Sequence, residues 1–275
     1  MKFIVLICLI LSPFSRVFGQ TYVQWIERGY NYLDKKELQA SANCFKSAMR
    51  LEPANPNNFA LLTNLGTLQR RLGKKKEALE SYTAALSQQP ENLGVLDSRA
   101  SLYAELGKIE KAIQDYSAFL ILAPENQAAL YSRGMVFLQE KDFIRAQKDF
   151  DQLLKLNDKS VPARLGYALM EKLQGNFSDS EKIYDYLISQ MPNSQSLYLD
   201  RGDMFFMSRK YGHAMRDVNK ALQEGEPNAD LYMLKGKVFL AQNNSKEAKK
   251  AFDKAIELGA NPESFKVWKE ILNKK

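Results

Sequence analysis

The stretch "LGKKKEALESYTAALSQQP", residues 72–90, contains the pattern on which the fold depends. Small side chains at Ala78 and Ala85 flank a single aromatic ring, Tyr82, and Pro90 ends the stretch. The same arrangement returns at intervals of 34 residues along most of the chain. A period of this length indicates an array of repeats, each of which is one supersecondary element.

Each repeat has the spacing of two amphipathic helices. Leu130, Gly134 and Phe137 lie at positions i, i+4 and i+7, and Ala146 and Phe150 continue the helical spacing downstream. A small residue lets two helix backbones approach each other, so that the ring of the second helix covers the glycine of the first. We therefore expect a closely packed helix pair in every repeat.

The predicted helix ends follow from turn and capping residues. Glycines such as Gly73 and Gly175 separate the two helices of a repeat, and a proline follows the second helix because proline cannot continue it. Asn126 stands where it can cap the helix that follows it, and either Asn244 or Ser245 can cap the second helix of the last repeat. The sequence "SDSE", residues 178–181, predicts a capping box.

These features resemble the tetratricopeptide repeat, whose pattern of Trp, Gly, Tyr, Ala, Phe and Pro has a period of 34 residues. The first repeat shows the pattern almost completely, at Trp25, Gly29, Tyr32, Phe45, Ala48 and Pro53. The resemblance extends from residue 22 to about residue 262. The fifth repeat departs most, because Arg164 and Glu171 stand where the family has apolar residues, which either weakens its first helix or marks it as functional.

The resemblance implies an all-α fold: a right-handed superhelical α-solenoid of seven helix pairs and a C-terminal capping helix. We expect one solenoid domain over residues 20–275, with the cap at residues 263–275. The predicted repeats cover residues 22–55, 59–92, 93–126, 127–160, 161–194, 195–228 and 229–262.

The first nineteen residues have the features of a secretory signal peptide. Lys2 precedes a run of apolar residues from Phe3 to Leu11, and small or apolar residues lead to a cleavage site after Gly19. The run is shorter than the roughly 20 residues that cross a bilayer, so an uncleaved anchor is the less favoured alternative. We expect an exported protein, periplasmic or secreted, with no membrane span in its mature chain.

The composition offers little catalytic chemistry. The only histidine is His213, and Cys44 is the only cysteine that remains after cleavage, so neither a zinc site nor a catalytic triad can be assembled. The net charge of +7 is too small to predict nucleic-acid binding by itself. We predict a protein that is not an enzyme, without metal, cofactor or nucleic-acid partner.

Charged residues recur at matched positions in three repeats. An arginine precedes the small residue of the first helix, and an aspartate stands sixteen residues later: Arg99 and Asp115, Arg133 and Asp149, Arg201 and Asp217. We predict that each pair links the two helices of its repeat, the alternative being unrelated surface charges.

The resemblance also implies a binding surface, because ligands of this family lie along the concave face formed by the first helices. Several residues at the corresponding positions are apolar: Tyr131, Met135, Leu138, Leu165, Leu169, Leu199 and Phe206. They predict docking of a hydrophobic peptide or an amphipathic helix from a partner protein. The alternative is that several of them pack between neighbouring repeats.

A second candidate surface is the basic turn, a cluster of five cations at Arg70, Arg71, Lys74, Lys75 and Lys76. Lysines near a helix C-terminus are ordinary, but such a cluster also suits an anion. The main functional hypothesis is a non-enzymatic scaffold that holds a protein partner. The alternatives are a binder of an anionic polymer or surface, or an accessory subunit of an envelope enzyme complex.

Overall fold

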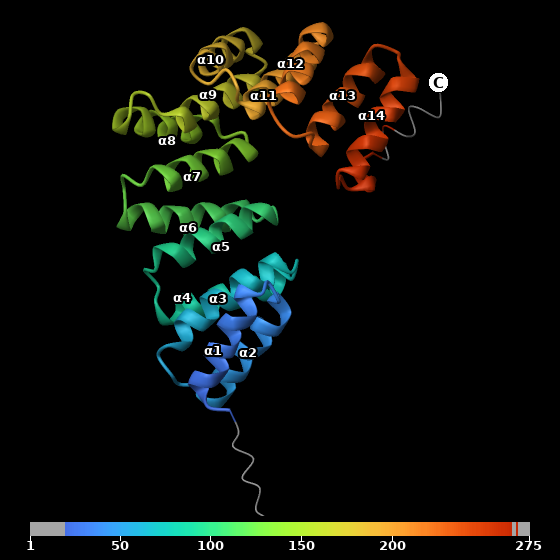
Figure 1. Cartoon of the computed structure of the whole chain (residues 1–275). Helices are drawn as coiled ribbons and strands as arrows, with labels where there is room; N and C mark the ends of the chain where they lie inside the picture. Colours follow the sequence, from blue (N-terminus) through green and yellow to red (C-terminus); the bar gives the residue numbers. More distant parts are fainter. Residues whose placement is uncertain (1–19, 266–267, 269–275) are drawn as a thin grey trace, which may run out of the picture. The chain divides into compact units, whose positions relative to one another are not determined.

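The computed structural model describes residues 20–265 and residue 268 (Figure 1). The predicted signal peptide, residues 1–19, and most of the predicted cap helix lie outside the described residues. Within the described part, the chain forms fourteen α-helices and one short 3-10 helix, with no strand. None of these helices is long and apolar enough to cross a membrane.

The helices occur in pairs whose order matches the predicted repeats. The first helices of the pairs are α1 (Tyr22–Asp34), α3 (Asn58–Arg71), α5 (Leu93–Glu105), α7 (Gln127–Gln139), α9 (Val161–Gln174), α11 (Gln195–Met207) and α13 (Ala229–Ala241). The second helices are α2 (Leu38–Leu51), α4 (Lys75–Gln88), α6 (Ile109–Leu122), α8 (Phe143–Leu156), α10 (Phe177–Gln190), α12 (Tyr211–Glu224) and α14 (Ser245–Glu257). Every first helix starts at the predicted first residue of its repeat, except α3, which starts one residue earlier.

The chain divides into two compact units, residues 1–102 and 103–275. In the first unit, α2 packs on α1 and α3, and α4 packs on α3. In the second unit, each helix from α6 to α13 packs on the helix that follows it in the chain. That both units form one domain stays a prediction.

The contact between a glycine and an aromatic ring holds the helix pairs together. A Cβ atom added to Gly134 of α7 or to Gly166 of α9 would lie 2.5 Å from Cε1 of Phe150, which belongs to α8 between them. The same close approach joins a glycine and a ring in three other repeats: Gly29 and Phe45, Gly66 and Tyr82, Gly236 and Phe252. The prediction that the ring covers the glycine is confirmed.

The turns between paired helices share one backbone conformation. Gly73, Gly107 and Gly175 have φ angles of +75°, +67° and +83°, in the left-handed region that glycine adopts without strain. In the repeats that lack this glycine, Lys36, Lys141, Arg209 and Asn243 take φ angles between 57° and 62°. The turn geometry is therefore kept even where a side chain makes it unfavourable.

The capping predictions are confirmed in two cases and wrong in one. The side chains of Asn126 and Asn244 accept hydrogen bonds from the backbone of Ala129 and Glu247, at 2.9 and 3.3 Å. The capping box at residues 178–181 is wrong, because α10 already begins at Phe177. Ser180 instead donates from Oγ to the carbonyl oxygen of Ala168 at 2.8 Å, which joins α10 to α9.

The described part of the predicted cap covers the last repeat. Phe265, at the end of the 3-10 helix (Pro262–Phe265), is fully buried and packs edge-on against Phe252, with 5.5 Å between ring centroids. Trp268 lies 6.3 Å from the same ring. The apolar face of α14 is thus closed by aromatic side chains.

The substitution Gly134→Ala should lower the free energy of unfolding by about 1–3 kcal/mol, because the added Cβ must displace the ring of Phe150. The matched control is Gly212→Ala in α12, where the added Cβ meets no atom within 4 Å. That control should be neutral or stabilising by up to about 1 kcal/mol, since alanine favours helix over glycine. Urea denaturation of both variants tests the contact, and equal midpoints would contradict it.

Candidate functional site

Arg133 joins three helices of the second unit. From α7 its Nε and Nη2 donate to both carboxylate oxygens of Asp149 on α8, at 2.9 and 2.7 Å. Its Nη1 also donates to Oγ of Ser117 on α6, at 3.1 Å. The predicted pair is confirmed, and the arginine additionally links its repeat to the preceding one.

Arg201 of α11 repeats this arrangement two repeats later. It donates to both oxygens of Asp217 on α12, at 2.8 and 2.7 Å, and to Asp185 on α10, at 2.5 Å. Burial lowers the pKa of the guanidinium, but hydrogen bonds and charge contacts with Asp217 and Asp185 raise that pKa above its ordinary value. We call this arrangement of one arginine and two second helices the arginine clip.

The aspartate that each arginine contacts in its own repeat is buried, whereas Asp185 is 56% exposed. The side chains of Asp149 and Asp217 are only 6% and 7% exposed, so these are not surface pairs. Arg99 and Asp115 belong to different units, and their pairing stays a prediction. Arg99 does donate to Oγ1 of Thr83 on α4, at 3.2 Å, which is the contact with the preceding repeat.

The fifth repeat has no arginine clip. Tyr167 of α9 occupies the position of the arginine, and its hydroxyl donates to Asp151 on α8 at 2.5 Å. Ile183 of α10 occupies the position of the aspartate. The pKa of Tyr167 is raised by burial and by its hydrogen bond to Asp151, so the hydroxyl stays protonated.

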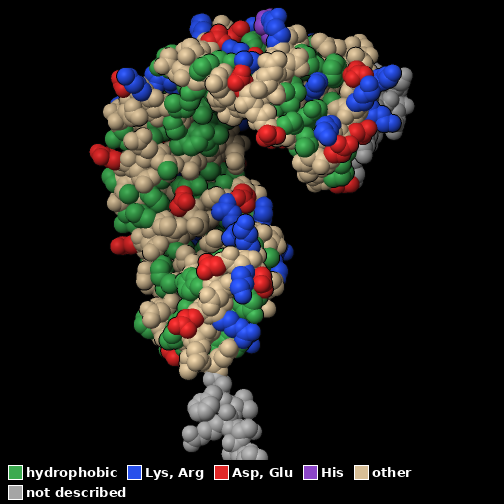
Figure 2. All heavy atoms as spheres, in the orientation of Figure 1, with side chains coloured by type: hydrophobic (Ala, Val, Ile, Leu, Met, Phe, Trp, Pro, Cys, Tyr) green, Lys and Arg blue, Asp and Glu red, His purple; other side chains and the backbone are tan. Residues whose placement is uncertain are grey.

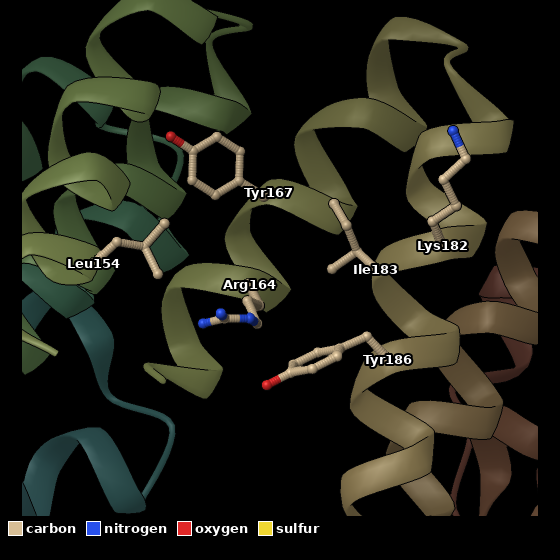
Figure 3. A pocket seen from close by; sticks show the side chains of 6 residues that line it. All are labelled: Leu154, Arg164, Tyr167, Lys182, Ile183 and Tyr186. Carbon is tan, nitrogen blue, oxygen red and sulfur yellow. The ribbon is translucent and has the colours of Figure 1, made fainter. Parts of the chain in front are cut away.

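A pocket of about 280 Å³ lies where the clip is missing (Figure 3). Its lining residues come from α8, α9 and α10: Leu154, Arg164, Tyr167, Lys182, Ile183 and Tyr186. The guanidinium of Arg164 stacks over the ring of Tyr186, 5.0 Å from its centroid, and donates to the carbonyl oxygen of Asp158 at 2.7 Å. We call this space the repeat-5 pocket.

Hydrophobic side chains gather on the surface of the second unit over α7, α8 and α9 (Figure 2). The residues predicted to bind a partner have unequal exposure. Leu138 is 3% exposed and belongs to the core. Six others are partly exposed: Tyr131, Met135, Leu165, Leu169, Leu199 and Phe206. We call these six residues the first-helix surface, since α7, α9 and α11 carry them.

Part of the first-helix surface also serves packing. Leu165, Leu199 and Phe206 contact the buried cluster around Tyr184. The ring of Tyr131 lies 6.4 Å from that of Phe150. One side of each of these four side chains therefore packs within the fold, and whether the other side binds a partner stays a prediction.

Charged groups also lie close to the first-helix surface. Lys172 of α9 forms an ion pair with Asp203 of α11, 2.9 Å between Nζ and Oδ2. Burial raises the pKa of Asp200, the charge of Lys172 opposes this, and the charge of Asp203 adds to it. The charge of Asp200 in turn adds to the effect of burial in raising the pKa of Tyr131. The carboxylate of Asp200 on α11 thus lies near Tyr131 of α7.

Asp200 differs from the clip aspartates in its hydrogen bonding. Among the residues that the structure describes, it accepts no hydrogen bond and joins no ion pair. Its neighbour in sequence, Arg201, is engaged by Asp217 and Asp185 instead. Nothing in the repeat pattern distinguishes Asp200, and so sequence reasoning missed it.

The basic turn in the first unit is partly engaged by its own surroundings. Arg70 donates to Oγ of Ser101 at 2.9 Å, and Lys74 donates to Oε1 of Gln39 at 2.7 Å. Burial raises the pKa of Asp97, an effect that the charge of Arg70 opposes. Arg71 and the remaining two lysines complete the turn, and Lys and Arg side chains are conspicuous along this unit in Figure 2.

The reactive residue types are placed where they do not suggest catalysis. Cys44 is buried, and burial raises the pKa of its thiol, which keeps it protonated. His213 is exposed beside the ring of Phe205, with 5.0 Å between ring centroids. No group of three or more potential metal ligands occurs in the part of the chain that the structure describes.

The substitution Arg201→Met should lower the free energy of unfolding by roughly 3 kcal/mol, because it leaves the buried carboxylate of Asp217 without its partner. Lys250→Ala is the control, since Lys250 pairs with Glu247 at the surface and should contribute under about 1 kcal/mol. Urea denaturation measures both, and hydrogen exchange in α11 and α12 locates the effect. A similar small loss in both variants would show that the clip contributes no more than a surface pair.

Comparison with known proteins agrees with this architecture. Tetratricopeptide repeat models match residues 26–92, 98–143 and 229–261. A crystal structure of a tetratricopeptide repeat protein from Parabacteroides merdae is 50% identical, with a TM-score of 0.85, and the match covers 93% of this chain and 98% of that one. No curated protein matches the chain significantly.

Two more distant structures show the fold alone. PilW, a type IV pilus biogenesis factor, is 20% identical with a TM-score of 0.57, and the match covers 70% of this chain and 90% of PilW. A chain of the Cut9–Hcn1 complex is 11% identical with a TM-score of 0.62, over 91% of this chain and 55% of that one. The repeat signature, the glycine–ring contacts and the 50% identical structure lead to one conclusion: the chain belongs to the tetratricopeptide repeat family.

Proposed function

We propose that this protein is an exported, non-enzymatic scaffold that holds a segment of a partner protein against the first-helix surface of α7, α9 and α11. Proteins of this family generally act as scaffolds for protein interactions, which supports the class of function. The partly exposed apolar side chains of Met135, Leu165 and Leu169 support the proposed location of the binding surface.

The observation that carries the proposal is Asp200. A half-buried carboxylate without a hydrogen-bond donor costs stability, and charged groups kept in such places often serve binding. A lysine or arginine of the partner would supply the missing donor, while apolar partner residues cover Leu165 and Leu169. The expected partner segment is therefore apolar with one basic residue.

The basic turn is the weaker candidate. Arg70 and Lys74 already donate hydrogen bonds inside the first unit, which leaves fewer cations for an anionic polymer. An accessory role in an envelope enzyme complex is compatible with the scaffold, since the partner would then perform the chemistry.

Export rests on residues 1–19, whose basic start, apolar run and small residue before the cut are those of a signal peptide. The mature protein should begin at Gln20 and occur in the periplasm or outside the cell. Mass spectrometry of the N-terminal peptide from fractionated cells measures this. Recovery of a cytoplasmic protein that begins at Met1 would contradict export.

A photo-cross-linking residue in place of Leu169 should capture the partner in cells, and one in place of Ile144 should not, because Ile144 is 73% exposed on α8 away from the first helices. Adding Asp200→Asn should reduce capture at least about tenfold, since the loss of one charge-assisted hydrogen bond costs about 1.5–3 kcal/mol. Adding Met135→Glu should also abolish capture while stability changes by less than about 0.5 kcal/mol. The cross-linked peptide, identified by mass spectrometry, should contain a basic residue.

Stability separates binding from packing. Because the pKa of Asp200 is raised in the folded state, its stabilising contribution is present at low pH and lost as the pH rises through that pKa. Asp200→Asn should therefore be more stable than the parent at pH 7, and the difference should shrink as the pH approaches the ordinary aspartate pKa of about 4. Asp253→Asn, at an exposed site on α14, is the control. Capture and stability falling together in Asp200→Asn or Met135→Glu would assign these residues to the core.

A further inference from the structure

We propose that the repeat-5 pocket is a second docking site, which takes one large apolar side chain of a partner peptide together with an adjacent carboxylate. The pocket lies between the second helices α8 and α10, with α9 beneath, and it includes none of the six residues of the first-helix surface. It therefore serves a contact separate from the one proposed above.

The apolar floor of the pocket follows from the missing clip. In repeats 4 and 6, an arginine joins a second helix on each side and places charges across this position. In repeat 5, the hydroxyl of Tyr167 is used by Asp151, and Ile183 offers no polar atom toward α9. The ring of Tyr167 lines this space together with Ile183 and Leu154, and no side chain among the described residues fills it (Figure 3).

The charged lining residues are both cations. Arg164 donates one hydrogen bond to the carbonyl oxygen of Asp158. Because a guanidinium has five N–H donors, others can bind a ligand carboxylate. Lys182 pairs with Asp179 in a contact where both side chains are more than half exposed, so a ligand carboxylate can exchange for it at little cost. An anionic group beside the apolar side chain therefore complements the rim.

The size of the pocket limits its occupant. Sites for drug-sized ligands and cofactors occupy roughly 300–1,000 Å³, and this pocket is slightly below that range. One aromatic or branched aliphatic side chain suits it better than a cofactor. Tyr186 is 43% exposed at the rim with Arg164 stacked on it, and tyrosine and arginine are the residue types that dominate binding energy at interfaces.

Repeat 4 provides an internal comparison. The corresponding space between α6 and α8 is lined by Ser117, Arg133, Asp149 and Gln152 together with apolar residues. There the clip crosses the floor, and Asp149 would repel a ligand carboxylate. Both repeats thus have a pocket at this location, but the one in repeat 4, of about 370 Å³, has the charged clip in its lining, whereas the one in repeat 5 has an apolar floor and a cationic rim.

The test uses the peptide acetyl-Glu-Phe-Glu-amide, with acetyl-Lys-Phe-Lys-amide and acetyl-Glu-Ala-Glu-amide as controls, titrated into the intact protein with isotope-labelled leucine methyl groups. The methyl signals of Leu154 should shift saturably with the first peptide, with a dissociation constant of about 1 mM or below. The signals of Leu51, exposed in the first unit, should not move. Each control peptide should bind at least tenfold more weakly.

The double substitution Tyr167→Arg and Ile183→Asp installs the clip of repeats 4 and 6 in repeat 5, with Asp151 as the second acceptor. It should abolish the Leu154 response while the melting temperature stays equal or rises. Arg164→Gln, a milder change, should leave the fold intact and remove the preference for the glutamate peptide over the lysine peptide.

Three results would overturn the proposal. Unchanged binding in the double variant would show that the peptide binds elsewhere. If the lysine peptide bound as tightly as the glutamate peptide, the pocket would not require a carboxylate in its ligand. Self-association of the parent protein that the double variant loses would identify a second copy of this chain as the occupant. None of these outcomes bears on capture at Leu169, so the two proposals fail independently.

Discussion

The rest of the structure depends on the seating of one aromatic ring against glycine backbone. Phe150 is wedged between Gly134 in its own repeat and Gly166 in the next, and a single added carbon at either glycine would meet the ring at 2.5 Å. The ring therefore sets both the spacing within a pair and the spacing to the following first helix. In repeat 4, this contact fixes the distance between the helices that the clip of Arg133 joins.

The periodic part of the structure was predictable from the sequence, and the exceptions were not. Helix starts and the Arg133–Asp149 and Arg201–Asp217 pairs follow from residues that recur at a fixed spacing. The contact of Arg201 with Asp185 was missed because it crosses between repeats and Asp185 belongs to no motif. Leu138 was predicted to face a partner but is buried, because the sequence alone does not show whether an apolar residue at this position faces the solvent or the core. The residues from Ser178 onward fit a capping box, but α10 begins at Phe177, directly after the left-handed turn at Gly175, and so before the predicted cap.

Repeat 5 shows how a repeat array tolerates a local exception. In such arrays, stability is approximately a sum of terms within repeats and between neighbours, so the loss of one clip affects only adjacent helices. Tyr167 keeps half of the clip through Asp151, and Ser180 ties α10 to α9 through the carbonyl of Ala168. The departure noticed in the sequence at Arg164 therefore does not interrupt the stacking of α9 and α10.

The two unusual features of the second unit lie close together in the sequence, and they differ in kind from the rest of the fold. Burial disfavours the charged form of Asp200, and the repeat-5 pocket has an apolar floor where repeat 4 has the charged groups of a clip. Neither feature contributes to the packing of the helices as the glycine–ring contacts and the clips do. Local rules are broken most often where a protein uses its surface for something other than its own folding. Under our two proposals Asp200 would bind a cation and Arg164 an anion, so repeats 5 and 6 would contact partner segments of opposite charge.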